Sequence, residues 1–187
     1  IQRILNIKAS WLIHRDGCIQ VKLDVKKDME FPFLPRFGLR LFLDQSLDRV
    51  RYCGMGPDES YPDKHQASWH GIFEGDVRTM HRPYLKPQEY GSHWDCSWCE
   101  ISGEEMSFQA SSKEGFMFQA CEYTQEELSE KAHDFELKEA GCTVLCLDHN
   151  QSGIGSGSCG PQLLEKYQFN EPEFSRAWVI TPGKRKE

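Results

Sequence analysis

The sequence contains no apolar run long enough to cross a lipid bilayer, so a helical membrane span is excluded. Its first ten residues, IQRILNIKAS, have neither the apolar stretch nor the small-residue cleavage site of a secretory signal peptide. From both absences we expect a soluble, cytoplasmic protein without a membrane partner.

The sequence has fewer basic than acidic residues. The chain has 22 Lys and Arg residues against 29 Asp and Glu residues, which gives a formal net charge of −7. A nucleic-acid surface needs clustered cations to neutralise phosphates, and the one basic cluster here is the terminal stretch 184–186. We therefore expect no nucleic-acid partner.

The sequence also lacks a recognisable set of metal ligands. Cys96 and Cys99 have the spacing of a zinc or redox pair, but three residues rather than two separate Cys142 from Cys146, so no second pair exists. In a regular strand, residues three apart point to opposite faces, which would separate the Cys96 and Cys99 thiols. The seven histidines show no i, i+4 ligand pair. We expect reduced, packed cysteines and no metal or cofactor in this chain.

Short alternating segments fill most of the chain. Apolar residues occupy every second position over 5–13 and 19–25, on either side of an Arg-Asp-Gly turn at 15–17, which predicts a hairpin. Further predicted strands cover residues 37–44, 49–56, 94–101, 105–112, 115–123, 142–148 and 176–182. This pattern predicts one all-β domain over residues 1–187, a large antiparallel β-sandwich.

One helix is predicted inside this pattern. Thr124 and Glu127 have the spacing of a capping box, in which each side chain bonds the backbone of the other residue. The helical segment continues to about Ala132.

The glycine-rich stretch DHNQSGIGSGSCGP, residues 148–161, suggests three uses. We expect no phosphate cradle, because the Gly-Lys-Ser/Thr ending and the following helix of a P-loop are both missing. A nucleophilic Cys159 would require a histidine base, and the sequence does not place His149 beside it. The third use is that the stretch shapes the edge of some other site.

Four loops combine glycine and proline with polar side chains in a way that generic turns do not require. Loops specified to this degree usually serve a site or an interface. Their candidate residues are Arg36, Gly54, Gly56, Pro57, Glu59, Tyr61, Asp63, Arg82, Pro83, Tyr84, Gln88, Glu89, Asp148 and Gln151.

The motifs LPRFG, YCGMGPDESYPD, RPYLKPQEYG and the glycine-rich stretch, in this order and spacing, resemble the C-terminal small-chain domain, domain 5, of glycoside hydrolase family 2 β-galactosidases. The resemblance covers the whole chain and implies the galactose-mutarotase-like supersandwich with one short helix. The domain of that family has further strands upstream of Ile1, so we expect this chain to lack its first strands. An unpaired sheet edge would then promote association between chains.

The resemblance also implies a location for the site. In the family the glycine-rich loop reaches the mouth of a catalytic barrel and lines the sugar site on its leaving-group side, which assigns the rim to Gly153, Gly155, Ser158 and Cys159. Some members carry a tryptophan where this sequence has Cys159. A thiol offers a smaller contact to a sugar than an indole ring does.

The implied function is a non-catalytic part of a β-galactosidase that hydrolyses terminal β-galactosides such as lactose. The catalytic glutamates and the Mg²⁺ and Na⁺ ligands of the family belong to the barrel, so this chain alone is expected to be inactive. Its implied partners are the rest of the enzyme, the galactoside and further subunits of a homo-oligomer. We expect Glu59 and Glu89 to be structural, bonded to backbone amides or to an arginine such as Arg36 or Arg82.

Two alternatives remain open at this point. An aldose 1-epimerase would need a histidine and a glutamate facing one cleft, and no histidine lies in a matching motif. A free-standing carbohydrate-binding module could use a tryptophan as a stacking platform, although tryptophans in a sandwich are more often core. The five tryptophans are Trp11, Trp69, Trp94, Trp98 and Trp178.

Overall fold

The computed structural model of the chain describes residues 2–155 and 160–184. Its strands are β1 (Leu5–Ile13), β2 (Ile19–Lys27), β3 (Arg36–Leu43), β4 (Arg49–Gly56), β5 (Trp69–Asp76), β6 (Ser92–Ser102), β7 (Met106–Cys121), β8 (Thr143–Gln151) and β9 (Glu173–Lys184). The short helices are α1 (Val77–Met80) and α2 (Gln125–Glu130), with 3₁₀ turns η1 (Asp134–Glu136) and η2 (Glu165–Tyr167).

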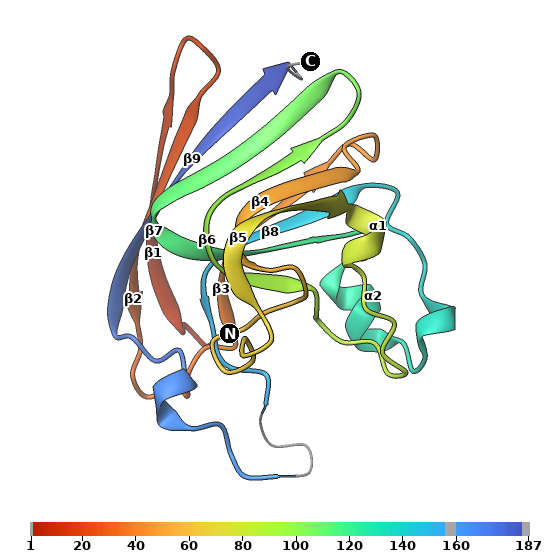
Figure 1. Cartoon of the computed structure of the whole chain (residues 1–187). Helices are drawn as coiled ribbons and strands as arrows, with labels where there is room; N and C mark the ends of the chain where they lie inside the picture. The colour runs from red at the N-terminus through yellow and green to blue at the C-terminus, as the bar shows by residue number, and fades with distance from the viewer. Residues whose placement is uncertain (1, 156–159, 185–187) are drawn as a thin grey trace.

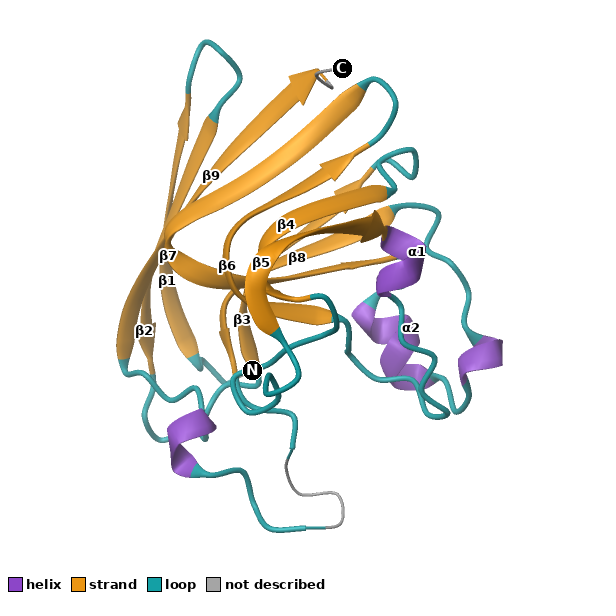
Figure 2. Ribbon diagram, viewed as in Figure 1, coloured by secondary structure: helices purple, strands orange, loops and turns teal. Residues whose placement is uncertain are grey.

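The strands form one antiparallel sheet that folds over itself into an open sandwich (Figures 1 and 2). The main path runs β1-β2-β9-β7-β6-β4-β5, and β8 branches from β7 and carries β3 on its other side. Side chains from both parts of the sheet meet in the main core, which contains Tyr52, Phe118, Leu147 and Trp178. The predicted all-β sandwich is therefore confirmed.

Strand β7 joins the two parts of the sheet. The sequence predicts two strands, 105–112 and 115–123, but the structure has one bent strand in which Met106–Ser111 pair with β9 and Met117–Cys121 pair with β8. At the bend, the guanidinium of Arg176, 5% exposed, donates to the carbonyl oxygen of Glu114 at 3.0 Å. This hydrogen bond satisfies the carbonyl oxygen of Glu114 at the bend.

The predicted first hairpin forms, but only half of its apolar face is buried. Trp11 pairs with Val21 across the hairpin. Val21 is fully buried, whereas Trp11 is 56% exposed and Ile13 is 71% exposed. Within residues 2–155 and 160–184, β1 pairs only with β2. The edge of β1 and an apolar row beside it therefore face solvent.

We expect the 187-residue chain to self-associate through β1, and the substitution Trp11→Lys to shift it to monomer. Exposed apolar edge strands pair readily with a second copy. A two-fold antiparallel pairing centred on Ala9 would set Ile7 opposite Trp11 and Lys8 opposite Ser10, so no like charges would be opposed. Sedimentation velocity over a range of concentrations measures this, with Phe135→Lys as a control because Phe135 is exposed far from β1 in sequence. A chain that sediments as a monomer at every concentration would show that this edge does not associate.

Two expectations about tryptophans and helices are wrong in part. Trp178 is fully buried, but Trp69 is 59% exposed on β5, a strand that the pattern of alternating apolar residues does not predict. The helix at α2 begins as predicted, since Thr124 Oγ1 accepts from the Glu127 amide at 3.1 Å. However, Glu127 accepts from the Lys138 amide at 2.9 Å rather than reaching back to Thr124. With α1 present, the expectation of a single helix is also incorrect.

The expected divergence of the Cys96 and Cys99 thiols is wrong as well. Both side chains are fully buried in the core. The β6–β7 register shifts on either side of Cys96, and Asp95 has a φ of 51°, so a bulge changes the simple alternation of the strand. Burial raises the pKa of the Cys99 thiol, which keeps it neutral and unreactive.

The described residues contain neither a membrane-spanning helix nor a cluster of metal ligands. No helix there is long and apolar enough to span a membrane. No group of three or more His, Cys, Asp or Glu side chains in the same part of the chain is arranged to hold a metal ion.

Candidate functional site

The four motif loops meet at one end of the sandwich, drawn at the bottom of Figure 1. Arg36 begins β3 and pairs with Gln151 at the end of β8, while the amide of Ser60 donates to the carbonyl oxygen of Ser92 at the start of β6. The antiparallel arrangement thus brings together segments that are more than one hundred residues apart. We call this group of loops the loop cluster; it comprises residues 34–36, 54–64, 82–92 and 148–155.

Arg36 is the hub of the loop cluster. Its Nε donates to Asp148 Oδ1 at 3.2 Å and its Nη2 pairs with the same carboxylate, while Nη1 pairs with Glu89. One side chain therefore joins three of the four motifs. The Asp148 side chain is 3% exposed, and its carboxylate also accepts from Gln151 Nε2 at 2.9 Å.

Burial and the arginine act in opposite directions on Asp148. Loss of water raises the pKa of the Asp148 carboxyl, and the adjacent Arg36 guanidinium opposes that rise. The carboxylate depends on this one cation, because within the described residues Asp148 has no other charged partner. Arg36 is therefore required to keep a buried charge in place.

Glu59 is the centre of a second group of contacts. Its carboxylate accepts from Lys64 Nζ at 2.5 Å, from the Gly91 amide at 2.9 Å, from the Tyr84 hydroxyl and from the Tyr61 hydroxyl at 3.3 Å. Burial alone would raise the pKa of Glu59, but the bonds from Lys64, Tyr84 and Gly91 outweigh it and lower the pKa below its usual value.

Both motif glutamates make contacts of the expected kind. Glu59 bonds a backbone amide, and Glu89 pairs with Arg36. Arg82 is not their partner, because its guanidinium pairs with the exposed Asp58.

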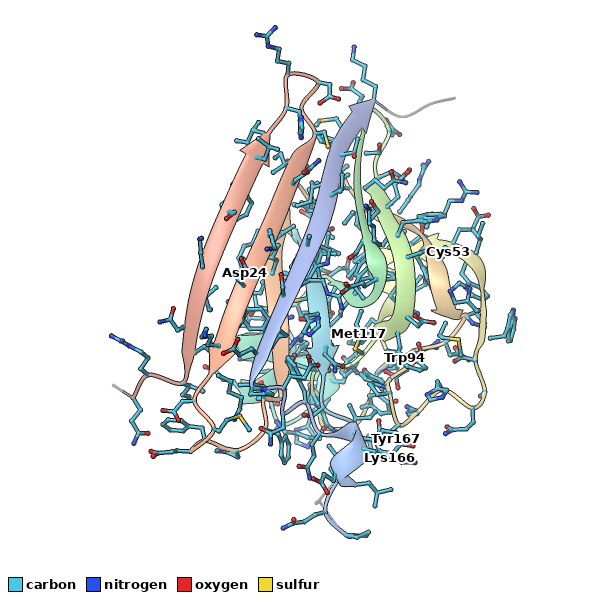
Figure 3. The ribbon with its side chains drawn as sticks, turned by 90° about the vertical axis from the view of Figure 1, so that its left-hand side faces the viewer. Asp24, Cys53, Trp94, Met117, Lys166 and Tyr167 are labelled. Carbon is cyan, nitrogen blue, oxygen red and sulfur yellow. The ribbon has the colours of Figure 1, made fainter. Side chains whose placement is uncertain are left out.

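Asp63 fixes the beginning of the glycine-rich loop. Its two carboxylate oxygens accept from the amides of Ile154, at 3.1 Å, and Gly155, at 2.8 Å. A Cβ atom on Gly153 would collide with this carboxylate, so glycine is required for the close approach. The amide of Gly153 donates to the carbonyl oxygen of Tyr167 in η2 at 3.1 Å; Figure 3 shows Tyr167 and Lys166 at the lower end of the molecule.

Not every predicted site residue joins these contacts. Ser158 and Cys159, predicted to lie on the rim, are outside the described residues. Pro83 and Gln88 are exposed, and Gln88 makes no side-chain hydrogen bond within the described part of the chain. Gly54 and Gly56 end β4, where a Cβ on Gly54 would clash with Cys96. The peptide between Gly56 and Pro57 is cis.

Sequence reasoning missed several residues that form hydrogen bonds within or to the loop cluster. Gln119 lies within 3.5 Å of Arg36 and also donates to the carbonyl oxygen of Tyr90. A glutamine in the otherwise apolar run FMFQAC was an available signal for a buried polar contact. Lys64 and Ser92 carried no comparable signal, because single polar residues in loops are common.

The loop cluster is suited to positioning loops rather than to acid–base chemistry. The carboxylates of Glu59, Asp63, Glu89 and Asp148 all accept hydrogen bonds or pair with cations. Burial raises the pKa of Tyr61 and of Tyr90, so neither hydroxyl ionises near neutral pH. What the arrangement provides is a rigid base for the glycine-rich loop.

The fold and the loop cluster define an all-β sandwich domain that presents rigidly anchored loops at one end. Residues 1–180 match the family model described as "Beta galactosidase small chain". The chain therefore belongs to the β-galactosidase small-chain family.

Three relatives illustrate this membership. The chain is 44% identical over 172 residues to a β-galactosidase from Actinobacillus pleuropneumoniae and 38% identical over 169 residues to one from Staphylococcus xylosus. These matches cover 92% and 89% of the chain but 17% of each relative. A β-galactosidase from Kluyveromyces lactis is 34% identical over 149 residues, which are 77% of the chain and 14% of that protein. The chain thus spans a small part of the length of the curated relatives it matches.

Proposed function

We propose that the chain acts as a non-catalytic domain of a cytoplasmic β-galactosidase that hydrolyses terminal β-galactosides such as lactose. Its loop cluster would complete the rim of the galactoside site, with the glycine-rich loop on the leaving-group side. The observation that carries this proposal is the pair of hydrogen bonds that the amides of Ile154 and Gly155 donate to the Asp63 carboxylate, which fix the beginning of that loop at the end of the sandwich.

The remainder of the enzyme would supply the chemistry. A retaining glycosidase needs two carboxyl groups about 5–5.5 Å apart, one as nucleophile and one as acid and base. The carboxylates of the loop cluster serve structural contacts, which favours a catalytic pair and Mg²⁺ and Na⁺ ligands in a barrel domain elsewhere in the enzyme. That barrel, the galactoside and the other subunits of a homo-oligomer are the proposed partners. The exposed apolar row on β1, which includes Trp11, offers a surface for such packing.

Replacement of the matched region of the Actinobacillus pleuropneumoniae relative by this chain tests the proposal. We expect the chimera to release nitrophenol from an aryl galactoside, and the chain alone to release none. In the chimera, Asp63→Ala frees the glycine-rich loop. The KM for lactose should rise roughly fivefold, as for a loss of about 1 kcal/mol of binding, with little change on the aryl substrate.

Asp44→Ala is the matched control, because Asp44 lies in the turn that follows β3, at the other end of the sandwich. A chimera with a normal melting temperature that responds equally to both substrates after Asp63→Ala would rule out the rim assignment. Hydrolysis by the chain alone would contradict the non-catalytic role.

A further inference from the structure

The outer face of the sheet carries a hollow that belongs to none of the contacts described above. It has a volume of about 740 Å³ and is lined by residues from five neighbouring strands, β5, β4, β6, β7 and β9. The hollow shares no residue with the loop cluster. Its charged side chains face away from the core, because Arg49 and Arg51 alternate with the buried Val50 and Tyr52 along β4.

Strand register places the outward side chains in straight rows across these strands. The first row is Glu74, Arg51, Glu100, Gln109 and Thr181. The second row is Asp76, Arg49, Ser102, Ser107 and Gly183. Both rows contribute to the lining of the hollow.

A third row, parallel to the first, is mainly apolar. It consists of Ile72, Cys53, Trp98, Ser111 and Val179. The guanidinium carbon of Arg51 lies 5.7 Å from the centre of the Trp98 ring, which joins the polar first row to the apolar third row. Cys53 is labelled in Figure 3, on the part of the sheet that carries β4.

Four of the five side chains in the first row have no bonding partner in the part of the chain that the structure describes. Within the described residues, Glu74, Glu100, Gln109 and Thr181 make no side-chain hydrogen bond or ion pair, although Arg51 lies between the two glutamates. Glu100 and Gln109 are moreover only partly exposed. Partly buried carboxylate and amide groups lose hydrogen bonds to water, and a hydrogen-bond partner normally replaces those bonds. A ligand in the hollow would provide that partner.

The charges of the lining indicate which kind of ligand fits. The cations Arg49, Arg51 and Lys184 are balanced by the anions Glu74, Asp76 and Glu100, so three positive charges meet three negative ones. An anion or a cation would gain no net attraction from this surface. A neutral ligand rich in hydroxyl groups could instead donate to the carboxylates and accept from the guanidinium and amide groups.

We propose that these three rows bind a neutral saccharide. A sugar ring has hydroxyl groups at its edge and an apolar C–H face, which match the polar first row and the apolar third row around Trp98. Gln109 can both donate to and accept from ring hydroxyls, and Glu100 accepts from a neighbouring pair. This saccharide site goes beyond the proposed rim function and does not depend on it.

Amide NMR of the 187-residue chain titrated with lactose or methyl β-galactoside tests the site. We expect saturable shifts at β6 and β7 around Glu100 and Gln109. Gln109→Ala and Glu100→Gln should each weaken the binding roughly tenfold, since each removes a polar contact to the sugar. Gln45→Ala and Glu130→Gln are matched controls, because both residues are exposed and lie outside the hollow, and they should leave the affinity unchanged.

Three results would overturn the proposal. They are the absence of any shift with either sugar, shifts confined to the loop cluster, and an unchanged affinity in the two variants of the hollow. Thermal melts verify that the variants fold. If Trp98→Ala fails to fold because Trp98 is partly buried, Trp98→Phe keeps an aromatic ring and should retain binding.

Discussion

Replacing Arg36 by alanine is expected to lower the free energy of unfolding by about 3–5 kcal/mol, because it leaves a buried carboxylate without its cation. Arg36 bonds Asp148 through two nitrogens, and the Asp148 side chain is 3% exposed. The same change removes the pairing partner of Glu89. Urea unfolding followed by tryptophan fluorescence would measure the loss as a lower midpoint at similar slope.

Two further variants separate this effect from a general loss of charge. Arg82→Ala breaks the pair with Asp58, whose side chain is 66% exposed, and should cost less than about 1 kcal/mol. The double variant Arg36→Met with Asp148→Leu removes both buried charges and should be more stable than Arg36→Ala, since no buried unpaired carboxylate remains and Glu89 is exposed to solvent. If Arg36→Ala costs no more than Arg82→Ala, Arg36 is not the hub of the loop cluster.

Acidification from pH 7 to pH 5 is expected to destabilise the protein by about 2 kcal/mol through His93 alone. The His93 ring is 2% exposed and packs against the rings of Tyr52 and Phe118. Burial lowers the pKa of His93 to about 4 from a usual value of 6.5. Between these two pKa values, His93 is protonated in the unfolded chain but neutral in the folded chain. The free energy of unfolding therefore falls as the pH falls.

The substitution His93→Phe tests this dependence, because phenylalanine retains the aromatic packing and cannot be protonated. Unfolding free energies at several pH values between 7 and 5 should fall less steeply in His93→Phe than in the wild type. Part of the dependence will persist, since the pKa of His149 is likewise lowered to about 4 by burial and by Arg176. His70→Phe, on the exposed side of β5, should leave the dependence unchanged. Identical pH profiles for the wild type and His93→Phe would exclude His93 as the source.

The sequence predicts the fold well where the pattern of apolar residues is regular. The hairpin of β1 and β2 and the strand β4 follow directly from alternation. The alternation of apolar and polar residues does not predict the structure where the backbone departs from a regular strand. Gly115 suggests a turn, yet β7 continues through it because Arg176, far along the chain, supports the bend. The bulge beside Cys96 similarly depends on pairing with β7, which no local pattern encodes.

The sequence predicts which motifs form the site, but it does not predict which of their side chains contact one another. Residues such as Arg36, Glu59 and Asp63 stood out because loops rarely combine glycine, proline and charge so densely. Which carboxylate meets which cation depends on strands that approach from distant parts of the chain. The pairing of Arg36 with Asp148 spans 112 residues, and the choice of Asp58 as the partner of Arg82 depends on the path of two loops.

Strand β7, which pairs with both β9 and β8, also affects how the protein unfolds. In a sandwich of two separate sheets, side-chain packing alone couples the layers, and one layer can loosen before the other. Here the backbone ladders of β9 and β8 are attached to successive halves of the same strand. A break in β7 removes pairing from both parts of the sheet in one event. We therefore expect both parts of the sheet to unfold together, because loss of β7 removes the strand with which β9 and β8 both pair.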